Sequence, residues 1–323
     1  MARRVATLML LAASVQAWGQ PVTGSADVSW HEGAVECDAA SWEPLQVHAY
    51  EPMTYILRQN PCAHFEANVI YLLVGGSRAL LIDTGPIDDP VRMPLARTVL
   101  GLLPTNEAGR LPLLVVHSHG HSDHRDGDAQ FISLPSVEIA PRGPDALRGF
   151  YGFDDWPDGS ASLDLGGRTV HVLPVPGHHP DHLAFYDERT ALLFSGDFLL
   201  PGRLLVDDVA AYRASASRLI GWLAGRPVAH VLGGHVELDV DGRLYPRGAS
   251  HHPDERPLAL AGDDLVALAA ALGDFNGFYA RHPHFTLSHP LRNLMVLAAA
   301  ALLVLALLAW GTRRLLRSRR HSR

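Results

Sequence analysis

Four histidines and an aspartate lie within eight residues, 117–124, directly after the apolar run 113–116. A short apolar run is typical of a buried strand, so the polar residues follow the end of a strand. Imidazole nitrogens and carboxylate oxygens are the usual ligands of zinc and similar divalent ions. If the backbone stays extended, His119, His121 and Asp123 point one way and the last histidine points elsewhere. The stretch therefore predicts ligands for two adjacent metal ions.

Further predicted strands also end in an acidic residue or a histidine. Asp83 follows one of them, and His178, Asp197 and His235 follow three others, each with a glycine before it. If these strand ends meet at one edge of a β-sandwich, the side chains surround a single site. Strands are expected at 69–74, 79–82, 113–116, 137–140, 163–165, 169–175, 183–186, 191–194 and 228–232, and helices at 89–103, at 208–224 and within 254–280.

The composition indicates one large globular domain. Of the 323 residues, 47% are hydrophobic and 19% are charged, which allows a sizeable buried core. Eight arginines lie at the two ends of the chain. The remaining 19 basic residues stand against 34 acidic ones, so the part between the ends carries a net charge of about −15. Such a surface repels polyanions, and we therefore expect no nucleic-acid substrate.

Both ends of the chain carry a segment typical of membrane targeting. Residues 1–17 combine a basic start, a short apolar centre and a small-residue exit, which predicts a signal peptide; an uncleaved anchor is the alternative. Residues 294–312 are a predicted transmembrane helix, because the stretch from Leu294 to Trp310 has no charge and would span about 26 Å. A buried core helix is the alternative there.

The arginine-rich segment 313–323 follows the apolar stretch directly, and a basic flank marks the cytoplasmic side of a membrane. The two ends together predict a single-pass protein of the inner (cytoplasmic) membrane. Its body would lie in the periplasm or outside the cell, its C-terminus in the cytoplasm, and the lipid bilayer would be a partner. Between the ends we expect an N-terminal extension at 18–65, a catalytic domain at 66–280 and a linker at 281–293. The sequence identifies no protein partner.

The chain has two cysteines, Cys37 and Cys62, and both lie in the predicted extension. In an oxidising compartment such a pair can form a disulfide, which would link two parts of the extension. Thiol ligation of a metal is the weaker interpretation, because neither cysteine is near the histidine cluster in the sequence.

The ordered motifs resemble those of the metallo-β-lactamase superfamily. They match in order and spacing over roughly residues 66 to 240, and they are Leu81-Ile82-Asp83-Thr84-Gly85, His119-x-His121-x-Asp123-His124, Pro176-Gly177-His178, Ser195-Gly196-Asp197 and Gly234-His235. The resemblance implies an α+β fold, the αββα sandwich of that superfamily, with the site at one edge.

The resemblance also implies a dinuclear metal centre. The implied ligands are His119, His121 and His178 for one ion, Asp123, His124 and His235 for the other, and Asp197 as a bridge between them. Asp83 would orient ligands through hydrogen bonds. Two divalent ions are therefore the expected cofactors, most simply Zn2+, with iron or manganese also compatible with this ligand set.

The chain departs from the family pattern beside His178. Where many members have Pro-Gly-His-Thr-Pro-Gly-His, this chain has His179 for Thr and Asp181 for Gly, which changes the polarity next to the first ion. The remaining histidines are not expected to bind metal: His117, His179 and His182 would support the ligands or lie on the surface, and His251, His252 and the linker histidines would lie on the surface.

Two divalent ions a few ångströms apart can share a water, lower its pKa towards neutrality and present hydroxide to a carbonyl or phosphoryl centre. Asp123 would act as the catalytic base, taking the proton and later passing it to the leaving group. The residues thus predict a metal-dependent hydrolase with a small-molecule substrate. The aromatic residues between 150 and 156 either pack in the core or form a wall for that substrate.

The residue at position 197 narrows the substrate. β-Lactamases of the superfamily usually have Cys or Ser there, whereas its thioesterases, lactonases and phosphodiesterases have Asp. Predicted export disfavours a glutathione thioesterase of the glyoxalase II type, and the acidic surface disfavours a nuclease of the ribonuclease Z type. We expect a small ester, lactone or thioester, with a phosphodiester or a β-lactam as alternatives. A non-catalytic, membrane-tethered binding or assembly protein is the alternative of another class, and the complete ligand set argues against it.

Overall fold

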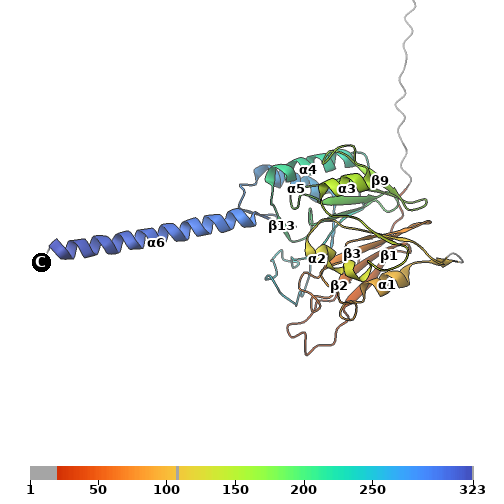
Figure 1. Cartoon of the computed structure of the whole chain (residues 1–323), viewed down its shortest axis with the longest axis horizontal. Helices are drawn as coiled ribbons and strands as arrows, with labels where there is room; N and C mark the ends of the chain where they lie inside the picture. The colour runs from red at the N-terminus through yellow and green to blue at the C-terminus, as the bar shows by residue number, and fades with distance from the viewer. Residues whose placement is uncertain (1–19, 107–108, 322–323) are drawn as a thin grey trace, which may run out of the picture.

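The structure is a computed structural model that describes residues 20–106 and 109–321, with side chains described up to residue 314. The predicted signal peptide, residues 1–17, lies outside the described residues. Two six-stranded sheets face each other, and helices cover their outer faces (Figure 1). The mixed α and β sandwich that the motifs implied is therefore confirmed.

The first sheet has the strand order β1-β2-β3-β4-β7-β8. Neighbours from β1 to β4 are antiparallel, and β4, β7 and β8 run parallel. The bounds are β1 Leu45–Glu51, β2 Thr54–Gln59, β3 Val69–Val74, β4 Ala79–Ile82, β7 Leu113–Val116 and β8 Val137–Ile139.

The second sheet has the order β15-β14-β12-β11-β10-β9. Only β12 and β14 are parallel neighbours; the other pairs are antiparallel. The bounds are β9 Ala161–Asp164, β10 Thr169–Pro174, β11 Leu183–Asp187, β12 Leu192–Gly196, β14 His230–Gly233 and β15 Ala259–Leu260. A further hairpin pairs β5 Thr105–Asn106 with β6 Gly109–Arg110.

Helices lie on both outer faces of the sandwich. Figure 1 shows α4 and α5 on one side of the sheets and α1 on the other. The helical bounds are α1 Leu95–Leu102, α2 Ser122–Arg125, the 3-10 helix η1 Asp126–Gln130, α3 Pro144–Tyr151, α4 Val209–Leu223 and α5 Gly262–Asp274. The first and third predicted helices are thus shorter than expected, whereas α4 matches its prediction closely.

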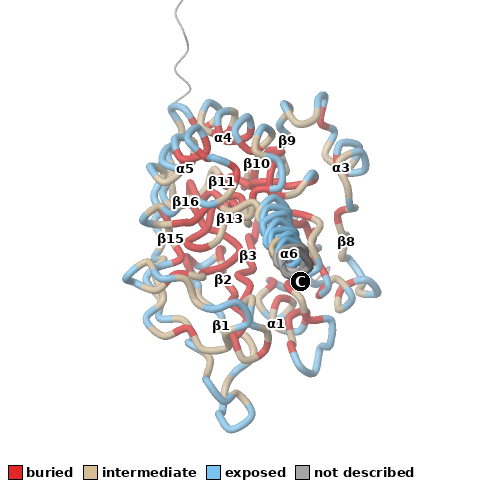
Figure 2. Tube along the Cα trace, turned by 90° about the vertical axis from the view of Figure 1, so that its left-hand side faces the viewer, coloured by how far each residue is buried: buried red, intermediate tan, exposed pale blue. Residues whose placement is uncertain are grey.

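Successive residues of the central strands face two different cores. In β3, Val69, Tyr71 and Leu73 point between the sheets, whereas Ile70 and Leu72 pack towards α1. Because these strands are buried on both faces, their sequences are unbroken apolar runs rather than alternating ones. Figure 2 shows the buried residues gathered in the middle of the body.

The predicted extension, 18–65, is wrong as a boundary, because β1 and β2 belong to the first sheet. Leu45, Val47 and Ala49 alternate with polar residues, which is the period of a strand, although Val47 and Ala49 are exposed and Tyr50 is buried. The alternation therefore marks a strand without revealing which face is covered. Cys37 and Cys62 are joined by a disulfide with Cα atoms 5.4 Å apart, which links the chain before β1 to the loop after β2.

The predicted linker, 281–293, is also corrected by the structure. β16 Tyr279–Arg281 and β17 Thr286–Ser288 form a hairpin, and β17 pairs in parallel with β13 Arg203–Leu205. Phe285 and Leu287 are buried. The apolar residues of this segment stand singly between polar ones, so no apolar run reveals a strand beside so many His and Pro residues.

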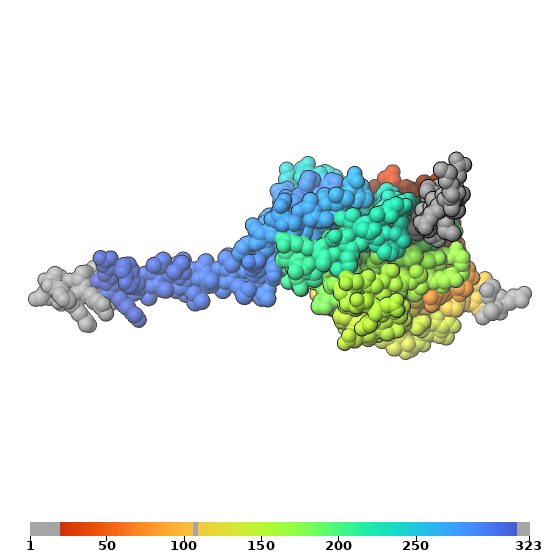
Figure 3. Space-filling view, turned by 90° about the horizontal axis from the view of Figure 1, so that it is seen from above, coloured from red at the N-terminus to blue at the C-terminus, as the bar shows by residue number. Residues whose placement is uncertain are grey.

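The last helix, α6 Pro290–His321, projects from the body as an isolated rod (Figures 1 and 3). It starts earlier and ends later than the predicted span 294–312. The most apolar 18-residue stretch of its segment Pro290–Arg314 has a mean hydropathy of 2.6, and none of that stretch is buried against the body. By length and composition it is a candidate membrane span, and the alternative of a buried core helix is wrong for this structure.

Candidate metal centre

The strand ends that were expected to converge meet at one edge of the sandwich. Asp83 follows β4, and the histidine-rich stretch follows β7, its parallel neighbour. Asp197 and His235 follow β12 and β14, the parallel pair of the second sheet. Parallel neighbours end at the same edge, so each sheet contributes side chains to one common site.

Three histidines form the first group of metal-binding type, His119, His121 and His178. Nε2 of His119 lies 2.8 Å from Nδ1 of His121, and Nε2 of His178 lies 3.2 Å from that same Nδ1. His119 and His178 are buried, whereas His121 is half-buried and borders the open cavity. His121 has an extended backbone, but the chain bends at Ser118 and Gly120, so the stretch is not one continuous strand.

Four residues form the second group, Asp123, His124, Asp197 and His235. Nε2 of His124 and Nε2 of His235 are 3.2 Å apart, and each lies 3.4 to 3.5 Å from an oxygen of both aspartates. Asp123 and His124 lie in the short helix α2, so the assumption of extended backbone also fails from Ser122 onwards. The helical turn directs Asp123 away from the first group and into the second.

Asp197 lies between the two groups. Its Oδ1 faces Nε2 of His124 and of His235, whereas its Oδ2 is 3.7 Å from Nε2 of His178. Oδ1 is buried and has no hydrogen-bond partner among the described residues. A buried carboxylate oxygen without a donor is costly, and a bound cation would satisfy it.

Hydrogen bonds on the far side of the rings define which nitrogen faces the site. Nδ1 of His178 lies 2.9 Å from the carbonyl oxygen of Leu205, and Nδ1 of His235 lies 2.8 Å from that of Glu66. Because a carbonyl oxygen only accepts, each Nδ1 carries the hydrogen and each Nε2 presents a lone pair in the neutral ring. This is the arrangement that orients metal-binding histidines in proteins.

Asp83 does the same for His124. Its carboxylate accepts from Nδ1 of His124 at 2.8 Å, from Oγ of Ser118 at 2.9 Å and from the backbone N–H of Ser118 at 2.7 Å. The residue is buried and has a φ of +66°, an unusual conformation for a side chain other than Gly or Asn. Backbone strain at Asp83 is therefore the energetic cost of holding this carboxylate behind His124.

The two groups differ in charge. Burial and the neighbouring histidines hold the pKa of His119 well below its usual value, so its ring is neutral. Burial alone would also lower the pKa of His235, but Asp197 and Asp123 outweigh it and raise that pKa to about 10. Burial opposes ionisation of both aspartates, yet the histidine charges lower their pKa values, so both are carboxylates at neutral pH.

Two glycines next to the ligands are required by close packing. A Cβ atom on Gly196 would lie 2.4 Å from Cβ of Ser118, and one on Gly234 would lie 2.8 Å from Oδ1 of Asp197. Both distances are too short for any side chain. The glycines that accompany the ligands in the sequence are therefore explained by crowding around the site.

The site opens into a cavity of about 630 Å³, which is a size suited to a small molecule. Its floor includes His121, His178, Asp197 and His235. Its other residues come from the loop after β2, from β13 and from the loop after β14, and include His64, Phe65, Glu66, Arg203, Leu205, Glu237, Tyr245, Pro246, Arg247 and His252.

The family model described as the metallo-beta-lactamase superfamily matches residues 65–241, more than half of the chain. The chain belongs to the metallo-β-lactamase superfamily. All seven residues of the two groups lie inside the matched segment, and the imidazole and carboxylate donors fit a superfamily that typically binds metal. β1, β2 and α6 lie outside the matched segment.

Several relatives in the superfamily are named as hydrolases or thioesterases. The hydroxyacylglutathione hydrolase of Anaeromyxobacter dehalogenans (strain 2CP-C) is 33% identical over 214 residues, covering 66% of this chain and 73% of the relative. The acyl-coenzyme A thioesterase MBLAC2 of Gallus gallus is 29% identical, covering 54% and 75%. An atrochrysone carboxyl ACP thioesterase of Claviceps purpurea (strain 20.1) is 29% identical, covering 64% of each chain. A solved metallo-beta-lactamase from Pontibacter korlensis has a TM-score of 0.47 at 18% identity, covering 72% and 100%. Membership of the superfamily and the names of the relatives support a hydrolase.

Several histidines were predicted not to bind metal, namely His117, His179, His182, His251, His252 and those of the linker, and none of them belongs to either group. Nε2 of His117 lies 2.7 Å from Asp128, and His179 pairs with Asp181, whose carboxylate also accepts from the backbone N–H of Gly120 at 3.0 Å. His117 and the residue pair at 179 and 181 therefore support the ligand-bearing loop from two sides.

His252 differs from its prediction, whereas His182 was expected to support a ligand or lie on the surface. Neither ring nitrogen of His182 has a hydrogen-bond partner among the described residues. Its buried ring stacks on that of His119, with centroids 4.9 Å apart, so it contacts a predicted ligand by packing. His252 was expected at the surface, but it is buried, bonds to Glu255 and stacks on Tyr245. Position in the sequence alone gave no sign of this tertiary packing.

The sequence did not reveal the walls of the cavity. No residue of the metal site was predicted before Asp83, yet the carbonyl of Glu66 orients His235 and Phe65 lines the cavity. The aromatic residues suggested as a wall, Phe150 to Trp156, pack in the core instead. Among the sequence-based predictions, only the disulfide pointed to this region, because Cys62 lies just before the wall residues.

Proposed function

We propose that the chain is a dinuclear metal-dependent hydrolase that acts on a small ester, lactone or thioester. The position of Asp197 is the observation that supports this most strongly. One carboxylate contacts both groups, with Oδ1 towards His124 and His235 and Oδ2 towards His178. The two groups are adjacent sets of metal-binding donor atoms that share a carboxylate. Such an arrangement fits two neighbouring divalent cations.

In this proposal the first group holds one ion, the second group holds the other, and Asp197 contacts both. Zn2+ fits, because it accepts imidazole and carboxylate ligands in low coordination numbers, and iron or manganese is also compatible. When bound, the ions supply Lewis acidity, which lowers the pKa of a nearby water and withdraws charge from the carbonyl under attack.

The chain itself supplies the proton acceptor. Asp123 borders the cavity, and a quarter of its side chain is exposed there. Its pKa is lowered despite burial, chiefly by the charge of His124, so it is ionised at neutral pH. An ionised carboxylate at the cavity would accept a proton from the attacking water and pass it to the leaving group; the lowered pKa weakens Asp123 as a base but makes its protonated form a good proton donor.

The substrate class rests on Asp197 and on the relatives. Two relatives are named as thioesterases and one as a hydroxyacylglutathione hydrolase. The cavity of about 630 Å³ is large enough for a small acyl compound. An ester, lactone or thioester is thus preferred over a phosphodiester or a β-lactam.

The apolar helix α6 extends the proposal to location. We place the protein in the inner (cytoplasmic) membrane, with α6 as its single span, the catalytic body in the periplasm and the arginine-rich end in the cytoplasm. The support is the hydropathy of Pro290–Arg314 together with the arginines that follow. Export would also permit the Cys37–Cys62 disulfide.

A substrate panel tests the chemistry. The zinc-loaded protein should hydrolyse a chromogenic ester, a lactone or an acetyl thioester, and His121→Ala should lower the rate at least about 100-fold, or roughly 3 kcal/mol. His31→Ala, at an exposed histidine away from the cavity, is the matched control. If protein with metal in both groups is inert on every substrate class, the enzyme proposal is wrong. If it acts only on a phosphodiester or a cephalosporin, the proposed substrate class is wrong.

A reporter fusion tests the topology. Alkaline phosphatase, which is active only after export, should be active when it is fused after His289, just before α6 begins. It should be inactive when fused at the C-terminus. The opposite pattern would place the catalytic body in the cytoplasm.

A further inference from the structure

We infer that the hydrolase takes its ester or thioester from the bilayer surface, as an amphiphile with an apolar acyl chain, because two walls of the cavity are built on the segment that leads into α6. This inference rests on the proposed function and names its substrate class. The argument uses the contacts of β13, β17, the loop after β14 and the first turn of α6.

The first wall is β13, which carries Arg203 and Leu205 into the cavity. Leu205 is the strand partner of Ser288 in β17, and the backbone N–H of Val206 donates to the carbonyl of Ser288 at 2.8 Å. The carbonyl of Leu205 also orients His178. The same strand therefore contacts a proposed metal ligand on one side and the root of α6 on the other.

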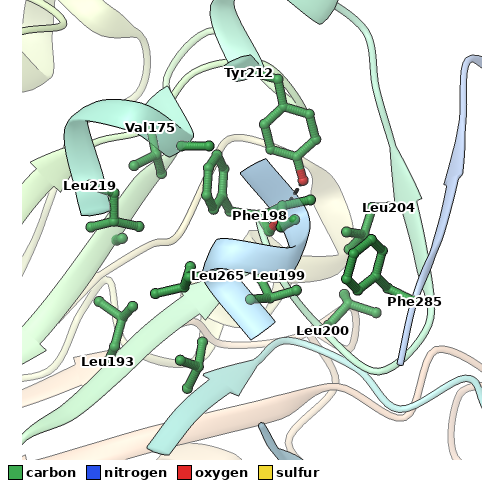
Figure 4. Close-up of a cluster of buried hydrophobic side chains, with 14 of the residues drawn as sticks. Val175, Leu193, Phe198, Leu199, Leu200, Leu204, Tyr212, Leu219, Leu265 and Phe285 are labelled. Carbon is green, nitrogen blue, oxygen red and sulfur yellow. Dashed lines mark hydrogen bonds between the residues drawn. The ribbon is translucent and has the colours of Figure 1, made fainter. Parts of the chain in front are cut away.

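The three-stranded sheet that contains β13 is fixed to the core rather than loosely attached. Leu204 of β13 and Phe285, which precedes β17, are fully buried beside Leu199 and Leu200, the residues that follow Asp197 (Figure 4). Packing of this density resists rotation of one part against the other. The root of α6 and the metal centre thus belong to one rigid unit.

The second wall is the loop after β14, which brings Tyr245, Pro246 and Arg247 to the cavity. This loop is hydrogen bonded to the segment before α6: Arg281 donates to the carbonyl of Gly242 at 2.6 Å, and Arg256 donates to the carbonyl of Pro283. Both walls are therefore held by the chain segment that leads into the proposed membrane span.

The first turn of α6 is also attached to the body. Nδ2 of Asn293 donates to the carbonyl of Phe278 at 3.0 Å, and the guanidinium of Arg292 lies 5.1 Å from the ring of Phe278. From Pro290 to Leu294 the helix rises about 6 Å, and the two residues before it add at most about 7 Å. With a headgroup layer of roughly 5–8 Å per leaflet, the cavity wall lies within roughly 10 Å of the membrane surface.

The rim of the cavity suits such a substrate. Phe65 is 41% exposed at the rim, and Leu205 and Pro246 add further apolar surface. The ring of Phe65 stacks on that of His64, with centroids 4.7 Å apart, and stays exposed beside the polar metal centre, which suits a ligand with an apolar chain next to a hydrolysable bond. The reacting carbonyl would reach the metal centre while the chain remains near the bilayer.

A rigid spacer tests this inference independently of the proposed function. Three EAAAK repeats inserted between Asn293 and Leu294 leave the contacts of the first turn intact and raise the body by about 20 Å. In phosphatidylcholine vesicles, kcat/KM for a palmitoyl thioester should fall about tenfold or more, while kcat/KM for a soluble acetyl thioester stays unchanged. The matched control carries the same repeats after Gly311, beyond the apolar stretch, and should retain both activities.

The possible outcomes are distinct. Equal activity of the two insertion variants on the palmitoyl thioester overturns the inference and leaves the hydrolase proposal standing. Hydrolysis of the acetyl but not of the palmitoyl thioester by the intact chain also overturns the inference alone. An intact chain that is inert on both thioesters and on the ester and lactone of the substrate panel overturns the proposed function and the inference with it.

A positional probe gives a readout without catalysis. A fluorophore on Arg247→Cys, at the cavity rim, should be quenched by nitroxide-labelled headgroups in vesicles. The same fluorophore on Arg110→Cys should not be, because the β5–β6 hairpin precedes β7 and so lies at the opposite edge of the first sheet. Equal quenching at both positions, or stronger quenching at Arg110→Cys, contradicts a cavity that faces the bilayer.

Discussion

The two groups of the metal centre are built differently. The first consists of three imidazoles, and burial lowers the pKa of His119 and of His121, so both remain neutral. The second combines two imidazoles with two carboxylates, and the carboxylates raise the pKa of His124 and His235 despite burial. A neutral set of nitrogen donors beside an anionic set gives neighbouring ions different environments. The difference suggests that the two positions differ in metal preference and in their dependence on supporting residues.

The supporting residues differ as well. In the first group, His178 is oriented by a carbonyl of β13, the strand that joins the root of α6. In the second, His124 is oriented by the strained Asp83 and His235 by Glu66, in the loop that begins at the disulfide. Changes at Asp83 or at the disulfide should therefore affect the second group first.

The largest effect is expected at the residue that the groups share. Asp197→Asn keeps the size of the side chain but removes the charge that faces both groups, and kcat/KM for the best substrate should fall at least about 1,000-fold, or roughly 4 kcal/mol. Steady-state kinetics measure the effect. Asp126→Asn, in the same cavity but outside both groups, is the control and should lie within about threefold of the wild type. A similar loss in both variants would mean that general cavity charge, not bridging, matters.

A smaller and one-sided effect is expected from Asp83→Asn. Asparagine tolerates the positive φ at this position but cannot hold His124 as an ionised carboxylate does, so metal affinity of the second group should weaken about 10- to 100-fold. Titration with a competing chelator gives the two affinities. Asp128→Asn, which loses the contact to His117, is the control. Equal weakening of both affinities would remove the distinction between the groups.

Metal preference offers a third comparison. Carboxylate ligands favour Mn2+ more than an all-imidazole set does, so Mn2+ should enter the second group first. His235→Ala should therefore weaken Mn2+ binding about tenfold, whereas His178→Ala should change it less than about threefold. Electron paramagnetic resonance of Mn2+ titrations measures this directly. If His178→Ala weakened Mn2+ binding more than His235→Ala, the assignment of charge to the two groups would be contradicted.

The disulfide is expected to give the smallest effect on the site. Replacing Cys37 and Cys62 by serine opens a link between residues 25 positions apart and should lower the free energy of unfolding by about 3 kcal/mol. Because the loop still packs on the body, metal affinity of the second group should weaken only two- to fivefold. Denaturant unfolding and the same chelator titration measure both quantities. Unchanged stability would show that the link does not restrain this loop.

The site residues were accessible from the sequence, because each follows an apolar strand and the strand ends converge for topological reasons. Asp83, Asp197 and His235 are far apart in the chain, yet each follows a strand of a parallel pair, which brings them to one edge; His178 follows β10, whose neighbours are both antiparallel. The family resemblance put Asp123 with His124 and His235, and it lies in that group, although a helical turn replaces the extended backbone first assumed for it. Local geometry of a few residues is decided by tertiary contacts that a sequence pattern does not record.

The cavity walls and the root of α6 were not accessible in the same way. Phe65 and Arg247 lie in loops without periodic pattern, and Glu66 acts through its backbone carbonyl, which any residue type possesses. The strand β17 is three residues long, and its burial depends on a distant partner, β13. Short strands and backbone contacts leave almost no signal in side-chain chemistry, so only the structure reveals them.

The central claim is that two ions bind side by side and share Asp197. The most direct measurement strips the full-length protein with a chelator, returns Zn2+ in steps, and follows bound zinc by mass spectrometry together with hydrolysis of a chromogenic substrate. The account predicts two ions per chain at saturation, with hydrolysis rising as the second ion binds, and at most one tightly bound ion in Asp197→Asn. Full activity with one ion per chain or fewer, or hydrolysis that survives complete removal of metal, would contradict it.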